Sequence, residues 1–137
     1  MRSRRRIALW AAAVAYAVAI FLLSSQPVPA PGEEVLAVIG DKALHAAEYV
    51  GFAVLLALAI ATAPSPWVRS RSALIALAGA VAYAATDEFH QTFVAGRQGS
   101  ILDFGADAAG AAIATAAYQA WRWWTARTPP VSDTSPR

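Results

Sequence analysis

Residues 73–92 read ALIALAGAVAYAATDEFHQT, an apolar run that ends in a cluster of acidic and other polar side chains. Asp87 lies 14 residues after Ala73, which is about 21 Å along a helix that rises ~1.5 Å per residue. If this helix crosses the ~30 Å hydrocarbon core of a bilayer, the carboxylate lies below the far interface. A carboxylate at that depth needs a partner or takes up a proton. The stretch therefore predicts a membrane-spanning helix that carries a polar site at one end.

Three further apolar stretches, residues 7–23, 43–63 and 102–121, alternate with clusters of charge along the chain. The 137 residues are 58% hydrophobic and 15% charged, and their mean hydropathy is +0.44. A soluble domain this small could not bury so much apolar surface, because its ratio of surface to volume is high. Since about 20 apolar residues span a bilayer, the pattern predicts an all-α, polytopic membrane protein with four transmembrane helices in one domain, residues 1–127.

The two signs of charge are sorted onto opposite sides of this predicted bundle. Of the 11 Lys and Arg residues, nine fall on one side and only Lys42 and Arg97 on the other. Of the nine acids, only Asp133 joins the basic side. Because Lys and Arg remain on the cytoplasmic side, we expect a multi-pass protein of the bacterial inner (plasma) membrane with both termini inside. Residues 128–137 are rich in Pro, Ser and Thr and are expected to form a disordered cytoplasmic tail.

The first apolar stretch has a second interpretation. Arginines, an apolar run and the small-residue stretch at 29–32 are also typical of a cleavable signal peptide. The run is long for a signal peptide and further spans follow it, so a retained helix is favoured.

Polar residues recur at helical spacing near the outer end of each predicted helix. In the second helix, Asp41, His45 and Glu48 share one face, and Lys42, His45 and Tyr49 form an adjoining stripe. Asp41 is also the predicted N-cap of this helix. We therefore expect the second helix to begin at the polar face.

The third and fourth helices carry matching patterns. Tyr83, Asp87 and Gln91 form one stripe, whereas Glu88 points about 100° away and is expected to pair with Lys42 or to reach water. In the fourth helix, Asp103 and Asp107 precede a small-xxx-small pair, Gly110 and Ala114, that would let a neighbouring helix approach closely. Asp103 could also serve only as the N-cap of that helix.

These acidic helix ends are expected to converge, with Lys42 and Arg97 neutralising them. The candidate binding residues are Asp41, Lys42, His45, Tyr49, Asp87, Glu88, Gln91, Arg97, Asp103 and Asp107. For each of them a structural ion pair or hydrogen bond is the competing interpretation.

The same residues carry a resemblance to a known family. The motifs are Asp41-Lys42-x-x-His45-x-x-x-Tyr49, Asp87-Glu88-x-x-Gln91, Gly96-Arg97, Ser100, Asp103, Gly110, and SSQP at 24–27. Together they resemble the VanZ-like family of small bacterial membrane proteins, over residues 9–114. Asp107 stands where the family usually has asparagine, and Ala114 where glycine is common. The family's namesake is associated with resistance to the glycopeptide teicoplanin, so the resemblance implies a cell-envelope context and does not specify a reaction.

The sequence leaves three functions open. In the first, Arg97 and Lys42 bind an anionic or peptidic envelope component, such as a lipid-linked precursor or a phospholipid headgroup. In the second, His45 is a general base and Asp87 an acid in transfer or hydrolysis at the outer leaflet. In the third, the protein is a proton-coupled transporter or accessory subunit, because intramembrane acids often mark proton paths.

Other chemistries receive less support. His45, Glu48, Asp87 and Asp107 could offer metal ligands, but no strong metal spacing appears, so neither a metal nor a cofactor is predicted. The absence of cysteine excludes thiolate sites, and nothing indicates nucleic-acid binding. The expected partners are the lipid bilayer, a lipid-linked envelope component and, as an open alternative, a second copy of the chain.

Overall fold

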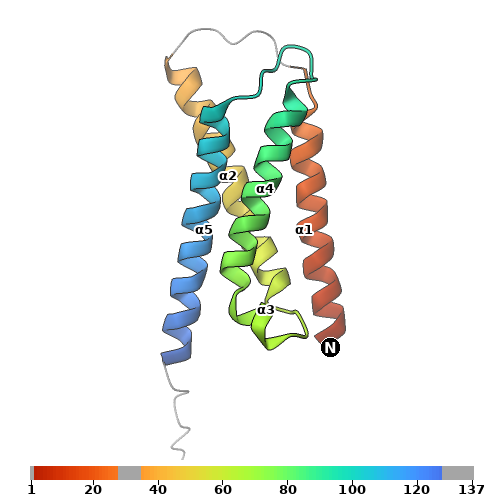
Figure 1. Ribbon diagram of the computed structural model, residues 1–137, viewed down its shortest axis with the longest axis vertical. Helices are drawn as coiled ribbons and strands as arrows, with labels where there is room; N and C mark the ends of the chain where they lie inside the picture. The colour runs from red at the N-terminus through yellow and green to blue at the C-terminus, as the bar shows by residue number, and fades with distance from the viewer. Residues whose placement is uncertain (1, 28–34, 128–137) are drawn as a thin grey trace, which may run out of the picture.

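The computed structural model describes residues 2–27 and 35–127, and all regular structure in those ranges is helical. The long helices α1 (Arg2–Ser24), α2 (Val35–Ile60), α4 (Ser72–Gln91) and α5 (Ile101–Arg127) run alternately up and down the long axis (Figure 1). The predicted all-α class is therefore confirmed. The small-residue stretch at 29–32 and the predicted tail at 128–137 lie outside the described residues.

The start of α2 corrects one prediction. The helix begins at Val35 rather than near Asp41, so Asp41 lies within the helix and cannot be its N-cap. Residues 35–39 are apolar, and the helical backbone continues from them through Gly40. A glycine inside a helix costs only about 1 kcal/mol relative to alanine, which is too little to end a helix that packs along most of its length.

The connection between α2 and α4 contains a short helix. α2 ends at Ile60, before Pro64-Ser65-Pro66, and the short helix α3 (Pro66–Ser70) follows at the lower end of the bundle (Figure 1). The side chain of Ser65 accepts a hydrogen bond from the backbone N–H of Val68, and Pro66 opens the helix. This turn holds Arg69, which donates to the carbonyl oxygens of Ala63 and Pro64.

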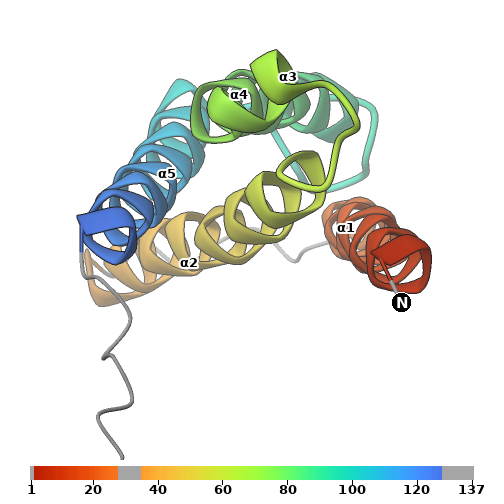
Figure 2. The same cartoon turned by 90° about the horizontal axis from the view of Figure 1, so that it is seen from below.

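Small side chains let the helices approach closely. Seen from below, α2 lies between α5 and α1, while α4 lies across the bundle from α2 (Figure 2). α2, α4 and α5 contact one another, and α1 packs mainly against α2. Alanines fill the buried core, among them Ala53, Ala80, Ala84, Ala111 and Ala114. A Cβ atom at Gly110 would overlap the carbonyl oxygen of Ala46, so the prediction that Gly110 admits a neighbouring helix is confirmed.

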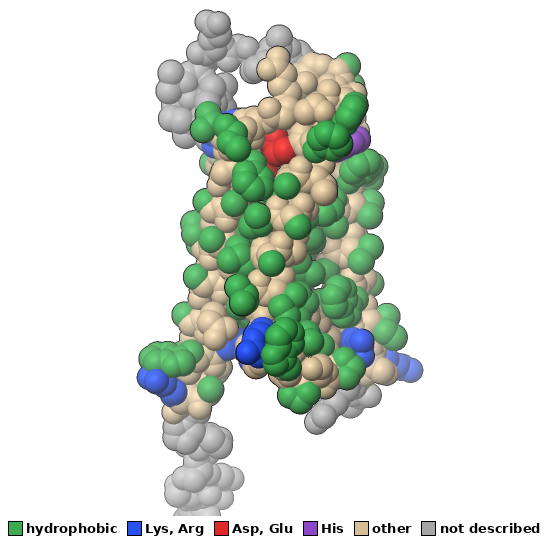
Figure 3. Space-filling model, viewed as in Figure 1, with side chains coloured by type: hydrophobic (Ala, Val, Ile, Leu, Met, Phe, Trp, Pro, Cys, Tyr) green, Lys and Arg blue, Asp and Glu red, His purple; other side chains and the backbone are tan. Residues whose placement is uncertain are grey.

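The outer surface of the bundle is apolar. Large hydrophobic side chains are exposed on each long helix, for example Val14, Leu44, Leu74 and Ile113. Figure 3 shows hydrophobic side chains along the length of one face, with several Lys and Arg side chains near its lower end. Within the described chain, two segments are long and apolar enough to cross a membrane, Ser3–Ser24 and Gly40–Ile60. α4 and α5, which carry buried acidic residues, are not among these segments.

Candidate functional site

The predicted site residues gather at one end of the bundle, where α1 and α4 end and α2 and α5 begin. We call them, with Ser24, Ser25 and Ser100, the upper polar cluster. The buried candidates are His45, Tyr49, Asp87, Glu88, Gln91, Asp103 and Asp107. Lys42 and Arg97 are half-buried, and Asp41 is exposed. The expected convergence of the acidic helix ends is therefore confirmed.

One half of the cluster faces α1. Asp87 accepts a hydrogen bond from Ser24 Oγ at 2.7 Å and another from Gln91 Nε2 at 3.1 Å. The Tyr83 hydroxyl donates to the carbonyl oxygen of Ala17 at 2.7 Å. The predicted stripe of Tyr83, Asp87 and Gln91 thus joins α4 to α1. Hydrogen bonds between helices can form here because i, i+4 and i+8 positions share one side of a helix.

Arg97 lies over the end of α1. Its guanidinium donates to Gln91 Oε1 at 3.2 Å and to the carbonyl oxygens of Gln26 and Leu23 at 3.0 and 3.2 Å. Gly96 adopts a left-handed backbone (φ 78°), which favours glycine and turns the loop before Arg97. The carbonyl groups at a helix C-terminus attract a cation. Among the described residues Arg97 forms no ion pair, so a direct contact between Arg97 and a carboxylate is not seen there.

The other half of the cluster joins α2 to α5. Lys42 forms ion pairs with Asp41 at 3.1 Å and with Asp103, so its predicted neutralising role is confirmed. His45 Nδ1 lies 3.1 Å from Asp107 Oδ1, and Asp107 is fully buried. His45 therefore contacts Asp107 directly, whereas Asp87, its predicted partner in acid–base chemistry, binds Ser24 and Gln91.

The contacts of Glu88 differ from those predicted from the sequence. It is 7% exposed, and its Oε2 accepts the backbone N–H of Ser100 at 2.7 Å, so it neither pairs with Lys42 nor reaches water. Ser100 Oγ in turn accepts the backbone N–H of Asp103 at 3.2 Å. Ser100 rather than Asp103 therefore caps the start of α5. A Cβ atom at Gly99 would lie 2.8 Å from the Glu88 carbonyl oxygen, which shows how closely this loop lies on α4.

Sequence reasoning did not select every polar partner in this cluster. His90 Nε2 lies 3.0 Å from Ser25 Oγ and adds a second contact between α1 and α4. The backbone N–H of Ser100, which holds Glu88, was also missed. His90 could have been found from its position in the same helix turn as Asp87, whereas a backbone donor leaves no signal in the sequence.

Acceptors exceed donors in the interior of the cluster. Four buried oxygen atoms have no hydrogen-bond partner among the described residues: Tyr49 Oη, Asp87 Oδ1, Glu88 Oε1 and Asp107 Oδ2. Such atoms are costly, at about 1–3 kcal/mol each, and are rare in folded proteins. The cluster is therefore chemically suited to hold an additional cation or proton.

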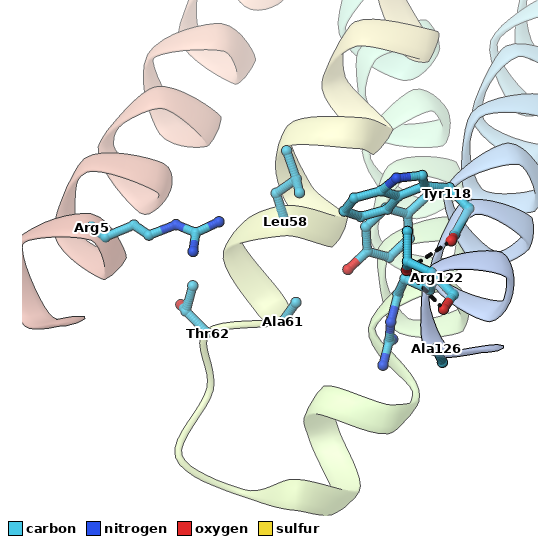
Figure 4. A pocket seen from close by; sticks show the side chains of 9 residues that line it. Arg5, Leu58, Ala61, Thr62, Tyr118, Arg122 and Ala126 are labelled. Carbon is cyan, nitrogen blue, oxygen red and sulfur yellow. Dashed lines mark hydrogen bonds between the residues drawn. The ribbon is translucent and has the colours of Figure 1, made fainter. Parts of the chain in front are cut away.

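A cavity of about 440 Å³ lies at the opposite, basic end of the bundle. Figure 4 shows Arg5 reaching from α1 towards Thr62 at the end of α2, with Tyr118 and Arg122 on α5 across the opening. Arg122 donates to Ser72 Oγ at 2.8 Å and to the Arg69 carbonyl oxygen at 3.0 Å. The candidate residues predicted from the sequence do not line this cavity.

A helical bundle with an apolar outer surface and two helices long and apolar enough to cross a membrane is typical of a membrane protein. The family model described as VanZ/LLP1 matches residues 10–122. The chain therefore belongs to the VanZ/LLP1 family, and the resemblance inferred from the sequence motifs is confirmed. No curated protein and no solved structure matches the chain.

Proposed function

We propose that this protein crosses the bacterial inner membrane four times, with both termini in the cytoplasm. The long helices contain 23, 26, 20 and 27 residues. At ~1.5 Å per residue each is at least about 30 Å long, enough to span the hydrocarbon core. The exposed apolar side chains on all of them support this arrangement. The basic residues of α1, α3 and α5 share the lower end, which would then be cytoplasmic.

The upper polar cluster would recognise an envelope component at the outer leaflet. The observation that carries this proposal is that the half-buried guanidinium of Arg97 has no carboxylate partner among the described residues. Of its five N–H donors, the contacts to Leu23, Gln26 and Gln91 engage three nitrogen atoms and leave donors for a ligand. The groups that a guanidinium binds best are phosphate and carboxylate.

The ligand would carry an amine beside its anionic group. At this end of the described chain, carboxylates outnumber Lys42 and Arg97; they are Asp41, Glu48, Asp87, Glu88, Asp103 and Asp107. A ligand with negative charge alone would be repelled by them. Phosphatidylethanolamine headgroups and the peptide part of a lipid-linked precursor combine both groups, so they belong to the class that we propose.

Arg97→Gln tests this function directly. Protein purified in detergent would be heated with phosphatidylethanolamine, with phosphatidylglycerol or with a lipid-linked peptide precursor. We expect an amine-bearing ligand to stabilise the wild type, by about 2.7 kcal/mol at a hundredfold excess over Kd, and the Arg97→Gln variant to lose that stabilisation. In cells, the variant should reach the normal membrane level and change sensitivity to lipoglycopeptide antibiotics.

Two further variants separate binding from folding. Arg69→Gln removes the same charge from the exposed turn at the lower end and should respond to the ligands like the wild type. Arg97→Lys keeps the charge near the α1 carbonyl groups and should fold even if Arg97→Gln does not. Equal stabilisation of wild type and Arg97→Gln, or no stabilisation of the wild type by any of these ligands, would contradict the proposal.

A further inference from the structure

We propose that His45, Glu88 and Asp107 form a binding site for a divalent transition-metal cation. The residues come from α2, α4 and α5, and all of them are buried. Each offers one ligand atom, and these atoms all lie within 4.8 Å of one another. Metal–ligand bonds of about 2.0–2.2 Å place neighbouring ligand atoms about 3–3.5 Å apart, so small side-chain movements would complete the coordination shell.

Unpartnered oxygen atoms on the same side chains independently point to a cation. Asp107 is 0% exposed and Glu88 is 7% exposed. Asp107 Oδ2 and Glu88 Oε1 lack a hydrogen-bond partner among the described residues. Two carboxylates this close cannot both remain charged at low cost. A dication between them would satisfy both oxygen atoms and offset the repulsion.

The surrounding chain already orients one of these ligands. The backbone N–H of Ser100, which lies outside the proposed ligand set, holds the second oxygen of Glu88 at 2.7 Å. Contacts of this kind hold ligands in place and are worth about 10–100-fold in metal affinity. Binding would therefore require little rearrangement of the helices.

The ligand set indicates which cations fit. One imidazole nitrogen with two carboxylates suits Zn²⁺, Mn²⁺, Fe²⁺ or Co²⁺, whereas Mg²⁺ and Ca²⁺ prefer oxygen ligands alone. Three protein ligands leave positions for water or another molecule. The sequence predicted no metal, because these ligands are far apart in the chain and only packing brings them together.

A neighbouring group is a weaker alternative. Asp41, His45 and Asp103 also place ligand atoms within 4.8 Å of one another. Lys42 already pairs with both of those acids, and the Asp41 side chain is 54% exposed. The inner group, which has no lysine partner, is therefore the site that we assign.

Cobalt binding tests the assignment. Full-length protein in detergent would be stripped with a chelator and titrated with Co²⁺, whose visible absorption reports binding to protein ligands. We expect wild type to bind, and Glu88→Gln and Asp107→Asn to lose affinity by about 10–100-fold or more. Asp41→Asn, which removes an acid from the same end outside the inner group, should bind like wild type. X-ray absorption of the Co²⁺-loaded wild type should show one imidazole in the shell.

Several results would overturn the site. The first is the absence of a Co²⁺ absorption band in the wild type. The second is an Asp107→Asn variant that binds Co²⁺ as tightly as the wild type, and the third is a Co²⁺ coordination shell without imidazole. The X-ray measurement uses the wild type alone, so the assignment stays testable if a variant fails to fold. Arg97→Gln should keep Co²⁺ binding while losing ligand-dependent stabilisation, and the metal site and the proposed function can therefore fail separately.

Discussion

At the scale of single residues, α4 divides its polar contacts between two neighbours. Asp87 and Glu88 are adjacent, and about 100° separates their directions on a helix. Asp87 binds Ser24 on α1, whereas Glu88 accepts the N–H of Ser100 at the start of α5. One helix turn therefore holds both sides of the upper polar cluster together.

A double-mutant cycle on Ser24 and Asp87 measures this contact. The 2.7 Å hydrogen bond is buried, and interhelical hydrogen bonds in membrane proteins contribute about 0.6 kcal/mol on average and up to about 1.7. We expect Ser24→Ala and Asp87→Ala, each of which removes one partner of this hydrogen bond, to reduce the free energy of unfolding in detergent, and to couple by an energy in that range. Thr86→Ala, at an exposed neighbouring position, should change stability by less than about 0.5 kcal/mol. Strictly additive effects would mean that Ser24 does not stabilise Asp87.

At the scale of elements, the contact between α2 and α5 determines where the cluster forms. Gly110 lies one helix turn below Asp107 and faces the Ala46 carbonyl oxygen, which is adjacent to His45 in sequence. The close approach of the backbones brings His45 within reach of Asp107. A bulkier residue at Gly110 would separate the two helices and with them the site.

Two glycine-to-alanine variants in α5 test whether Gly110 is needed for the close contact between α2 and α5. Gly110→Ala should reduce the free energy of unfolding by about 1–3 kcal/mol, because its Cβ meets a backbone oxygen that cannot rotate away. Gly105→Ala, where a Cβ meets nothing within 4 Å, should be neutral or stabilising by up to about 1 kcal/mol. Thermal or denaturant unfolding in detergent measures both. Equal effects of the two changes would contradict a close contact at Gly110.

At the scale of the whole molecule, the bundle has two chemically different ends. The upper end carries the buried acids with Lys42 and Arg97, and the lower end carries the arginines of α1, α3 and α5. The middle of the described bundle is packed largely with alanine and larger apolar side chains. This separation of charge supports the proposed arrangement, in which the two ends of the bundle face water on opposite sides of the membrane.

Cysteine labelling in intact cells tests the proposed orientation. The chain has no cysteine, so Gln98→Cys and Ser70→Cys, both at exposed positions in connections at opposite ends, give single reporters. A membrane-impermeant maleimide should label Gln98→Cys from outside and Ser70→Cys only after the cells are permeabilised, because the proposed orientation leaves the basic turn in the cytoplasm. Labelling of Ser70→Cys in intact cells would contradict the orientation, and labelling of both after permeabilisation is the control.

The sequence by itself determined the helical class, the end of the bundle that is polar and most of the residues found there. Hydropathy and charge are properties of local sequence, so apolar stretches and their acidic ends can be recognised without tertiary contacts. The spacing of Gly110 and Ala114 also predicted a close helix contact, because it depends only on helical periodicity. The start of α2 was missed because Asp41 resembled an N-cap, whereas the helix continues through Gly40 at a small cost.

The partners within the cluster were decided by the tertiary structure alone. His45 faces Asp107 because α2 and α5 meet at Gly110, and Arg97 binds the end of α1 because the loop turns at Gly96. Glu88 accepts a backbone N–H, a group that every residue except proline carries and that no motif marks. Which acid meets which cation depends on the rotation and spacing of whole helices. Many residues far apart in the chain determine that rotation and spacing jointly, so no local stretch of sequence predicts them.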